Sequence, residues 1–199
     1  TVSPSGGTAP YAYQWSPSGG TTATASSLQA GTYTCTVTDA GGCTAVASAV
    51  VTEPSAISAT ISVVDVTCFG QANGSAAITP SGGTGGYTYA WNSTPAQSTA
   101  TAVNLPASVF SCLVTDGAGC TASFFFFVYE PNLMVVTDLV TQPSCSTITT
   151  GEVQVSVSGG VSPYAYSWPG QSWTVPGVTG IPPGNYSYVV TDANGCKDT

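Results

Sequence analysis

The seven cysteines of this 199-residue chain are the residues that could take part in the most kinds of chemistry, from disulfide bonding to metal binding. Cys43, Cys120 and Cys196 close a Thr-Asp-x-x-Gly-Cys motif, and Cys68 and Cys145 stand 52 and 51 residues upstream of the last two. The chain has no histidine and no Cys-x-x-Cys pair, so the donor set does not favour a zinc site. The regular spacing instead predicts a disulfide framework formed in an oxidising compartment.

Each of these three motifs also carries an aspartate, namely Asp39, Asp116 or Asp192. Such an aspartate can close an Asx-type turn, or it can serve as a calcium ligand between domains. Calcium takes about six to eight oxygens, and no acidic cluster with ligand spacing surrounds these residues. We therefore favour the turn and expect no metal site. Glu152 and Asp138 occur once each, without a visible partner, and are interpreted as solvated strand residues.

Acid–base catalysis is not indicated by the titratable residues. It needs a tunable His, Glu, Asp or Lys held within a site. Lys197 is the only basic residue, and the acids are isolated or recur in turns. We expect no enzyme, no catalytic residue and no cofactor.

The charge content is low: 5% of residues are charged and the net charge is −8, whereas a soluble domain carries about 25% charged residues. Binding to nucleic acid or to an anionic membrane surface requires Lys or Arg, so neither partner is expected. No apolar run approaches the roughly 20 residues of a membrane span, which argues against direct membrane insertion. A neutral surface of this kind suits an extracellular protein.

One sequence pattern occurs three times. It begins as GGTAPYAYQW (6–15), GGTGGYTYAW (82–91) and GGVSPYAYSW (159–168), and each copy ends in the Asp-x-x-Gly-Cys motif. Equivalent residues lie 76 or 77 positions apart. A period held this closely predicts tandem domains of one kind.

The period divides the chain into three domains cut from a longer polypeptide. We expect a partial repeat at 1–54 without its first strand, a complete repeat at 55–131, and a repeat at 132–199 without its last strand. A circularly offset unit, completed by strands of a neighbouring chain, is the alternative.

The fold class follows from alternation with a period of two. Tyr33, Cys35 and Val37 alternate with threonines, as expected for antiparallel strands with one buried face. In the complete repeat we predict strands near 57–67, 74–80, 86–92, 99–104, 109–115 and 121–129. Short strands, a length near 75 residues and a tryptophan on the third strand indicate an all-β, immunoglobulin-like antiparallel sandwich. Several such domains would follow one another end to end.

Two pairings of the motif cysteines remain open. Within one repeat, Cys68–Cys120 and Cys145–Cys196 would each bridge a loop of about 50 residues and stabilise the fold by roughly 4 kcal/mol in the loop-entropy model. In a sandwich, however, Cys68 would lie near one end of the domain and Cys120 near the other, while a bridge needs Cα atoms within about 7 Å. A head-to-tail bond from Cys68 to Cys196 meets that requirement better. The partner of Cys43 would precede residue 1.

One tryptophan recurs in every copy and is expected in the core: Trp15, Trp91 and Trp168. Cys35 and Cys112 point inward on a core strand and are expected to be buried free thiols. Tyr33 and Tyr186 occupy the position of a tyrosine corner, whereas the middle copy has Phe110 there.

Two features lack a counterpart in the other copies. Trp173 is one, and we treat it as an interface candidate. The other is the run Phe124, Phe125, Phe126 and Phe127, of which alternation must direct two side chains out of the core. A loop or an adjoining domain could cover them, or they could contact another chain, as exposed apolar patches usually do.

Four segments recur in order and carry a resemblance. They are Cys-Phe-Gly-x-x-Asn-Gly-Ser (68–75), Gly-Gly-x-x-x-Tyr-x-Tyr-x-Trp, Leu-x-x-Gly-x-Tyr and Asp-x-x-Gly-Cys. Together they resemble the SprB-type repeat of large surface adhesins in gliding bacteria of the Bacteroidota. The resemblance implies an immunoglobulin-like fold, type IX secretion, and a role as a stalk or adhesive filament in gliding motility. Phe110, Ser108, Cys35 and Cys112 depart from the pattern, and the two cysteines leave any standard disulfide scheme open.

The leading hypothesis for function is a non-catalytic, adhesive repeat segment of a long cell-surface adhesin or filament. The alternative is a carbohydrate-binding or spacer module of a secreted hydrolase. Expected partners are neighbouring repeats of the same polypeptide, other copies in a filament, and surface polysaccharide.

Overall fold

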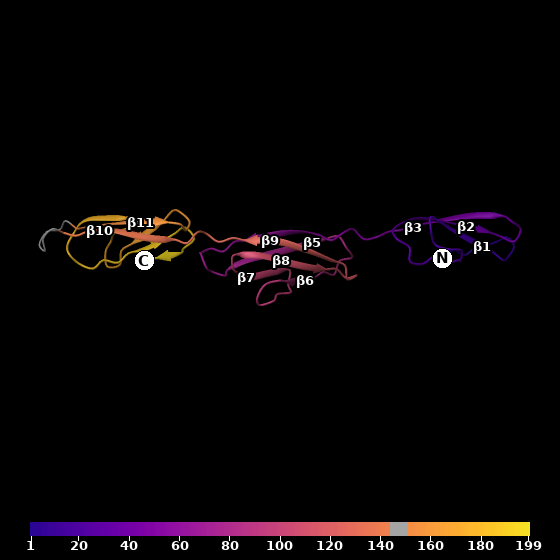
Figure 1. Ribbon diagram of the computed structural model, residues 1–199, viewed down its shortest axis with the longest axis horizontal. Coiled ribbons are helices and arrows are strands. Elements are labelled where there is room, and N and C mark those ends of the chain that lie inside the picture. Colours follow the sequence, from indigo (N-terminus) through magenta and orange to yellow (C-terminus); the bar gives the residue numbers. More distant parts are fainter. Residues whose placement is uncertain (144–150) are drawn as a thin grey trace. The chain divides into compact units, whose positions relative to one another are not determined.

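The computed structural model describes residues 1–143 and 151–199 (Figure 1). All of the regular elements in these ranges are strands, and no helix there is long and apolar enough to cross a membrane. The chain divides into two compact units, Thr1–Ala56 and Ile57–Thr199. The domain boundaries predicted after residues 54 and 131 stay predictions.

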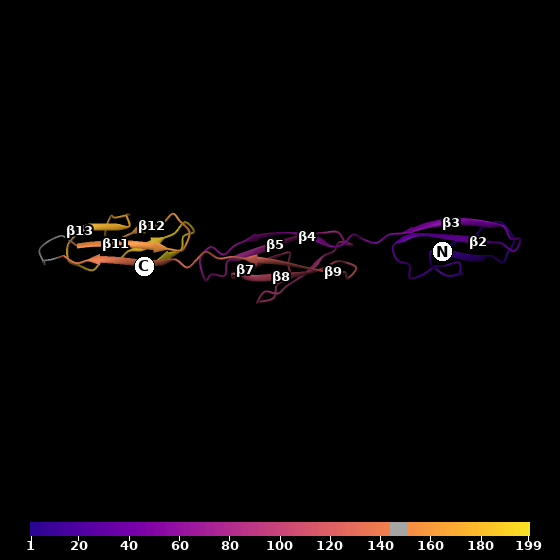
Figure 2. The same cartoon turned by 45° about the horizontal axis from the view of Figure 1, so that its top comes forward.

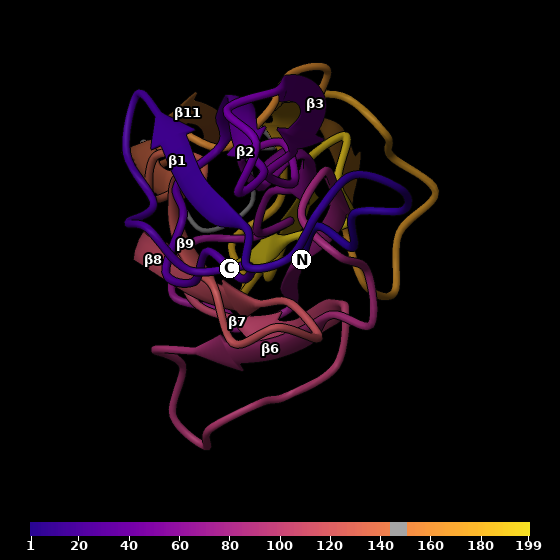
Figure 3. The ribbon, with the colours of Figure 1, turned by 90° about the vertical axis from the view of Figure 1, so that its right-hand side faces the viewer.

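The first unit contains one antiparallel sheet. Its strands β1 (Ala12–Ser16), β2 (Gly31–Thr38) and β3 (Thr44–Val51) lie in chain order across the sheet (Figure 3). The inward side chains of β2 are buried, as the alternation predicts. Trp15 pairs with Cys35 in register but is only half-buried. Its prediction as a core residue is wrong, because no strand of this unit forms a second sheet across from it.

The second unit begins with a sandwich of two three-stranded sheets (Figure 2). One sheet has the order β4-β5-β7 and the other β6-β8-β9. The strands are β4 (Ser58–Val64), β5 (Gly74–Ser81), β6 (Thr88–Trp91), β7 (Thr101–Leu105), β8 (Ser108–Thr115) and β9 (Thr121–Val128). In immunoglobulin nomenclature these orders are A-B-E and C-F-G. The predicted strands are confirmed, with ends that differ by at most three residues.

Aromatic residues fill the space between these two sheets. The Trp91 ring meets the edge of Phe126 at 5.6 Å between centroids, and Phe110 stacks on Phe126 at 5.9 Å. Trp91 and Cys112 are buried, as predicted. Phe126 points inward while Phe125 and Phe127 point outward, so the alternation inferred for the phenylalanine run is confirmed.

The same architecture returns in the last part of the chain. The sheets have the orders β10-β11-β13 and β12-β14-β15. The strands are β10 (Val135–Thr141), β11 (Gly151–Ser158), β12 (Ala165–Ser167), β13 (Gly177–Ile181), β14 (Val189–Thr191) and β15 (Lys197–Asp198). Trp168 is buried at the centre of a separate core. Trp173 meets its edge at 5.9 Å and also contacts Tyr186, so Trp173 belongs to this core rather than to a free surface.

The tyrosine corner inferred from the sequence is present in two copies. The Tyr33 hydroxyl donates to the carbonyl of Gln29 at 3.1 Å, and that of Tyr186 donates to Pro182 at 3.0 Å. Phe110 lacks a hydroxyl and fills the same position by packing alone.

Candidate functional site

The aspartate of each motif fixes the turn that carries its cysteine. In the last copy, Asp192 accepts bonds from the backbone N–H groups of Asn194 and Cys196, both at 2.9 Å, through one oxygen. Its other oxygen accepts from the N–H of Val161 at 3.0 Å. The carboxylate therefore ties the β14–β15 turn to the loop after β11. This is the Asx-type role predicted from the sequence.

The same bonds recur in the other two copies. Asp39 accepts from the N–H groups of Thr8 and Cys43, and Asp116 accepts from those of Thr84 and Cys120. This contact explains the second glycine of each pair, Gly7, Gly83 or Gly160. A Cβ atom on Gly83, at a φ of +60°, would lie 2.5 Å from the carboxylate of Asp116, so a larger residue would displace that carboxylate.

Hydrogen bonding lowers the pKa of all three carboxyl groups. For Asp39 the largest cause is the bond from Thr8, and for Asp116 it is the bond from Thr84. For Asp192, the largest single effect is burial, which would raise the pKa. The backbone hydrogen bonds from Val161, Cys196 and Asn194 together outweigh it. Each aspartate is therefore ionised at neutral pH and serves as an acceptor.

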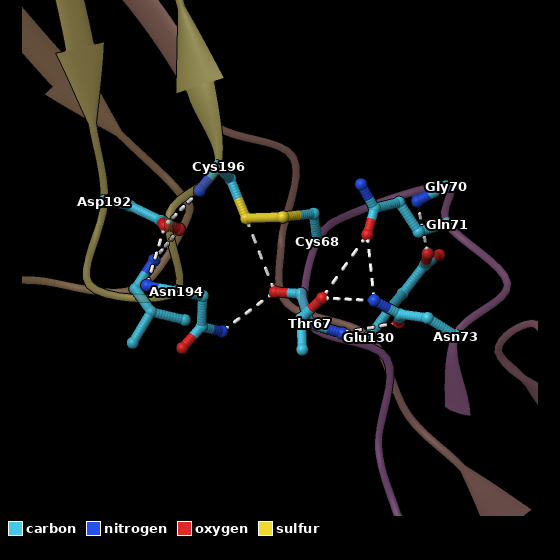
Figure 4. The surroundings of a disulfide bond; sticks show 10 residues. Thr67, Cys68, Gly70, Gln71, Asn73, Glu130, Asp192, Asn194 and Cys196 are labelled. Atoms are coloured by element: carbon cyan, nitrogen blue, oxygen red, sulfur yellow. Dashed lines mark hydrogen bonds between the residues drawn. A yellow bond between two sulfur atoms is a disulfide. The ribbon is translucent and has the colours of Figure 1, made fainter. Parts of the chain in front are cut away.

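A disulfide joins this turn to the preceding sandwich. Cys196 is bonded to Cys68, which lies 128 residues earlier in the chain, with Cα atoms 5.7 Å apart (Figure 4). That separation lies within the usual range for disulfides. Cys68 lies in the loop between β4 and β5, and Cys196 directly precedes β15. The bond thus connects two sandwiches that the backbone also connects between β9 and β10.

Polar contacts accompany the disulfide across the junction. The side-chain amide of Asn194 donates to the carbonyl of Thr67 at 2.8 Å, and the Cys196 sulfur lies 3.4 Å from the same oxygen (Figure 4). The turn of the later sandwich therefore contacts the cysteine loop of the earlier one through a covalent bond and a hydrogen bond.

The loop that carries Cys68 is itself held in place (Figure 4). The N–H of Thr67 donates to Asn73 Oδ1 at 3.1 Å, and Asn73 donates to Gln71 Oε1 at 3.0 Å. The N–H of Gly70 donates to the carboxylate of Glu130 at 2.6 Å. Because Glu130 lies two residues after the end of β9, in the segment that leads to β10, this bond fixes the cysteine loop to the connecting segment.

The disulfide decides between the pairings left open by the sequence. Cys68 and Cys120 do not pair, because Cys68 lies near the end of β9 and Cys120 directly precedes its start. Eight residues of strand at about 3.3 Å each separate the two ends by roughly 26 Å. A disulfide allows only about 7 Å between Cα atoms.

The other cysteines are placed in two different environments. Cys43 and Cys120 are exposed thiols in their Asp turns and form no disulfide within the described residues, although both were disulfide candidates. Cys35 and Cys112 are fully buried thiols, and burial raises the pKa of Cys112. Cys145, the remaining candidate, lies outside the described residues.

The first tyrosine after each double glycine has a structural role that its recurrence in the sequence does not reveal. The hydroxyls of Tyr11 and Tyr164 donate to the carbonyls of Gly6 and Gly159 at 2.7 and 2.6 Å, and Tyr87 donates to Gly82. The constant spacing, five positions from the first glycine to the tyrosine in every copy, is the sequence signal that accompanies this role. These bonds hold the loop that each aspartate also binds.

Comparison with known proteins gives one family. The SprB repeat model matches residues 1–21, 60–95 and 137–171. No curated protein matches the chain. Among solved structures, a chain reported under "Structural basis for Dscam isoform specificity" matches with a TM-score of 0.29 and 12% identity, over 82% of this chain and 51% of that one. Each family match lies in a different copy of the sequence pattern, and the chain therefore carries SprB-type repeats.

Proposed function

We propose that this chain is a non-catalytic, load-bearing and adhesive segment of a long extracellular protein. SprB repeats are structural repeats of cell-surface, adhesin-like proteins. The observation that carries the proposal is the Cys68–Cys196 disulfide, which gives two successive repeats a second covalent connection. A protein that transmits force between a cell and a surface gains from such a connection.

The chemistry of the junction supports an extracellular location. Structural disulfides persist in oxidising compartments and are rare in the cytosol. The low charge and the single basic residue, Lys197, support the same location, since they leave trypsin-like proteases one cleavage site. Export by the type IX route and service in gliding motility are parts of this proposal that derive from the family resemblance.

The state of the acidic residues supports a non-catalytic role. A general acid needs a pKa near the working pH, whereas those of Asp39, Asp116 and Asp192 are lowered. Their oxygens accept backbone N–H bonds that build the turns. The proposed partners are neighbouring repeats of the same polypeptide, other copies in a filament, and surface polysaccharide.

Surface labelling of intact cells that produce the parent protein tests the proposal. Antibodies raised against residues 57–199 are expected to bind unpermeabilised cells, and in-frame deletion of these repeats is expected to reduce attachment to surfaces. Labelling only after permeabilisation would overturn the extracellular location. Unchanged attachment after deletion would overturn the adhesive role.

A further inference from the structure

An exposed row of aromatic side chains lies on the outer face of the β6-β8-β9 sheet. Phe125, Phe127 and Tyr129 are 71%, 55% and 63% exposed, and we call them the aromatic strip. Val109, which pairs with Phe127 in register, and Leu113 extend the apolar surface on the neighbouring strand. Large apolar side chains gathered in this way usually mark a binding surface.

The fold does not require this strip. In the first unit, β2 and β3 pair in the same register as β8 and β9 do in the middle repeat. Their outward positions include Thr32 opposite Val50 and Thr34 opposite Ser48. A hydroxyl-rich pair of strands therefore forms the same ladder. The aromatic residues of the middle repeat must have a role other than pairing β8 with β9.

The strip is also fixed in space. Its members stand two residues apart, so they share one face at intervals of roughly 7 Å. The rings of Phe127 and Tyr129 are nearly parallel, with centroids 6.0 Å apart and an angle of 16° between planes. The N–H of Tyr129 donates to Asp65 at 2.9 Å, and its carbonyl accepts from Val66 at 2.9 Å. A ligand would therefore meet a largely preformed surface.

The surroundings of the strip favour an uncharged ligand. The other outward positions of β8 and β9 include Ser111, Thr115, Thr121 and Ser123, which offer hydroxyl groups for hydrogen bonds. No outward side chain of these two strands carries a charge. The net charge of −8 acts against an anionic ligand.

The size of the strip favours a narrow ligand over a second protein. The three aromatic side chains at these exposures present on the order of 400 Å², and Val109 and Leu113 add about 150 Å². A stable protein interface needs about 800 Å² from each partner. A sugar ring has an apolar C–H face and a rim of hydroxyl groups. The C–H face suits the negative face of an aromatic ring, and the hydroxyl rim suits the neighbouring serines and threonines.

We propose that Phe125, Phe127 and Tyr129 bind a neutral polysaccharide that lies along β9. The inference rests on the adhesive role proposed above and supplies the ligand class for it. The middle repeat is then the sugar-binding repeat among the described parts of the chain, and the first unit, with Ser48, Val50 and Thr52 in place of the three aromatic residues, acts as a spacer.

Affinity electrophoresis of the full 199-residue chain tests this site. Native gels would contain hydroxyethyl cellulose, dextran, galactomannan or the anionic polymer alginate. At least one neutral polymer is expected to retard the chain, and alginate is not. The double change Phe125→Ser and Phe127→Ser is expected to weaken binding at least tenfold. The control Val46→Ser and Val50→Ser alters two equally exposed residues of β3 and is expected to leave binding unchanged.

Thermal unfolding of both double variants must match that of the unchanged chain, since all four side chains point outward. Migration unaffected by every neutral polymer, or equal retardation of the phenylalanine variant, overturns the proposal. Sedimentation that shows a dimer abolished by the same variant makes a second copy the occupant and also overturns it. None of these results bears on the proposed extracellular location, which is tested separately by labelling intact cells.

Discussion

Pulling a single chain from its two ends measures whether the Cys68–Cys196 bond carries load. In the oxidised protein, force that enters at residue 57 passes from Cys68 through the disulfide to Cys196, and the segment between them stays shielded. That segment spans 128 residues. Because an extended residue adds at most about 3.3–3.6 Å, the bond hides roughly 440 Å of chain.

Force spectroscopy should show this length only when the bond is absent. The oxidised chain is expected to release about 190 Å from the first unit, Thr1–Ala56, and little more. Reductant, or the change Cys68→Ser, is expected to add the roughly 440 Å of chain that the bond hides. Cys120→Ser removes an unpaired thiol and serves as the control, with no added length. Release of the full length by the oxidised, unchanged chain would refute the head-to-tail connection.

Three further predictions concern thiols, packing and acid stability. Of the cysteines that the structure describes, iodoacetamide will alkylate Cys43 and Cys120 in the native protein, and Cys35 and Cys112 only after unfolding. Phe126→Ala will lower the free energy of unfolding by about 3–5 kcal/mol, whereas the outward Phe125→Ala will change it by about 0.5 kcal/mol or less, both measured by urea titration. The turn aspartates have a pKa below the ordinary 3.8, so the stability they contribute is present above that pH and is lost as the pH falls through the lowered pKa. Urea midpoints between roughly pH 6 and pH 2 will measure this loss.

Each of these experiments has an outcome that contradicts the structure. A native Cys120 that resists alkylation would be bonded or buried. Equal losses for Phe125→Ala and Phe126→Ala would contradict the register of β9. A urea midpoint that rises on acidification below the ordinary pKa would contradict the role of the turn aspartates.

Local features of the fold could be predicted from the sequence. The strands follow from period-two alternation, and the aspartate turns follow from residues only four positions apart, such as Asp192 and Cys196. The inward and outward phenylalanines of β9 were foreseen for the same reason. Contacts of this kind are decided by neighbouring residues, whose chemistry the sequence displays directly.

Features that depend on distant segments were harder to predict. The exposure of Trp15 depends on whether a second sheet covers it. The repeat pattern alone predicts that Trp15 is as buried as the equivalent Trp91, which it is not. Trp173 has no counterpart in the other copies, so symmetry offered no guide to its packing on Trp168. The partner of Cys68 depends on how one sandwich follows another, which the spacing of cysteines within a repeat does not encode.

The 128-residue separation of the bonded cysteines also sets an order of events in time. Cys68 is synthesised before Cys196, so this bond cannot form until the later repeat has been made. The Cys196 sulfur reaches it only when Asp192 has organised the turn between β14 and β15. Closure of this bond therefore marks the point at which the later repeat has folded.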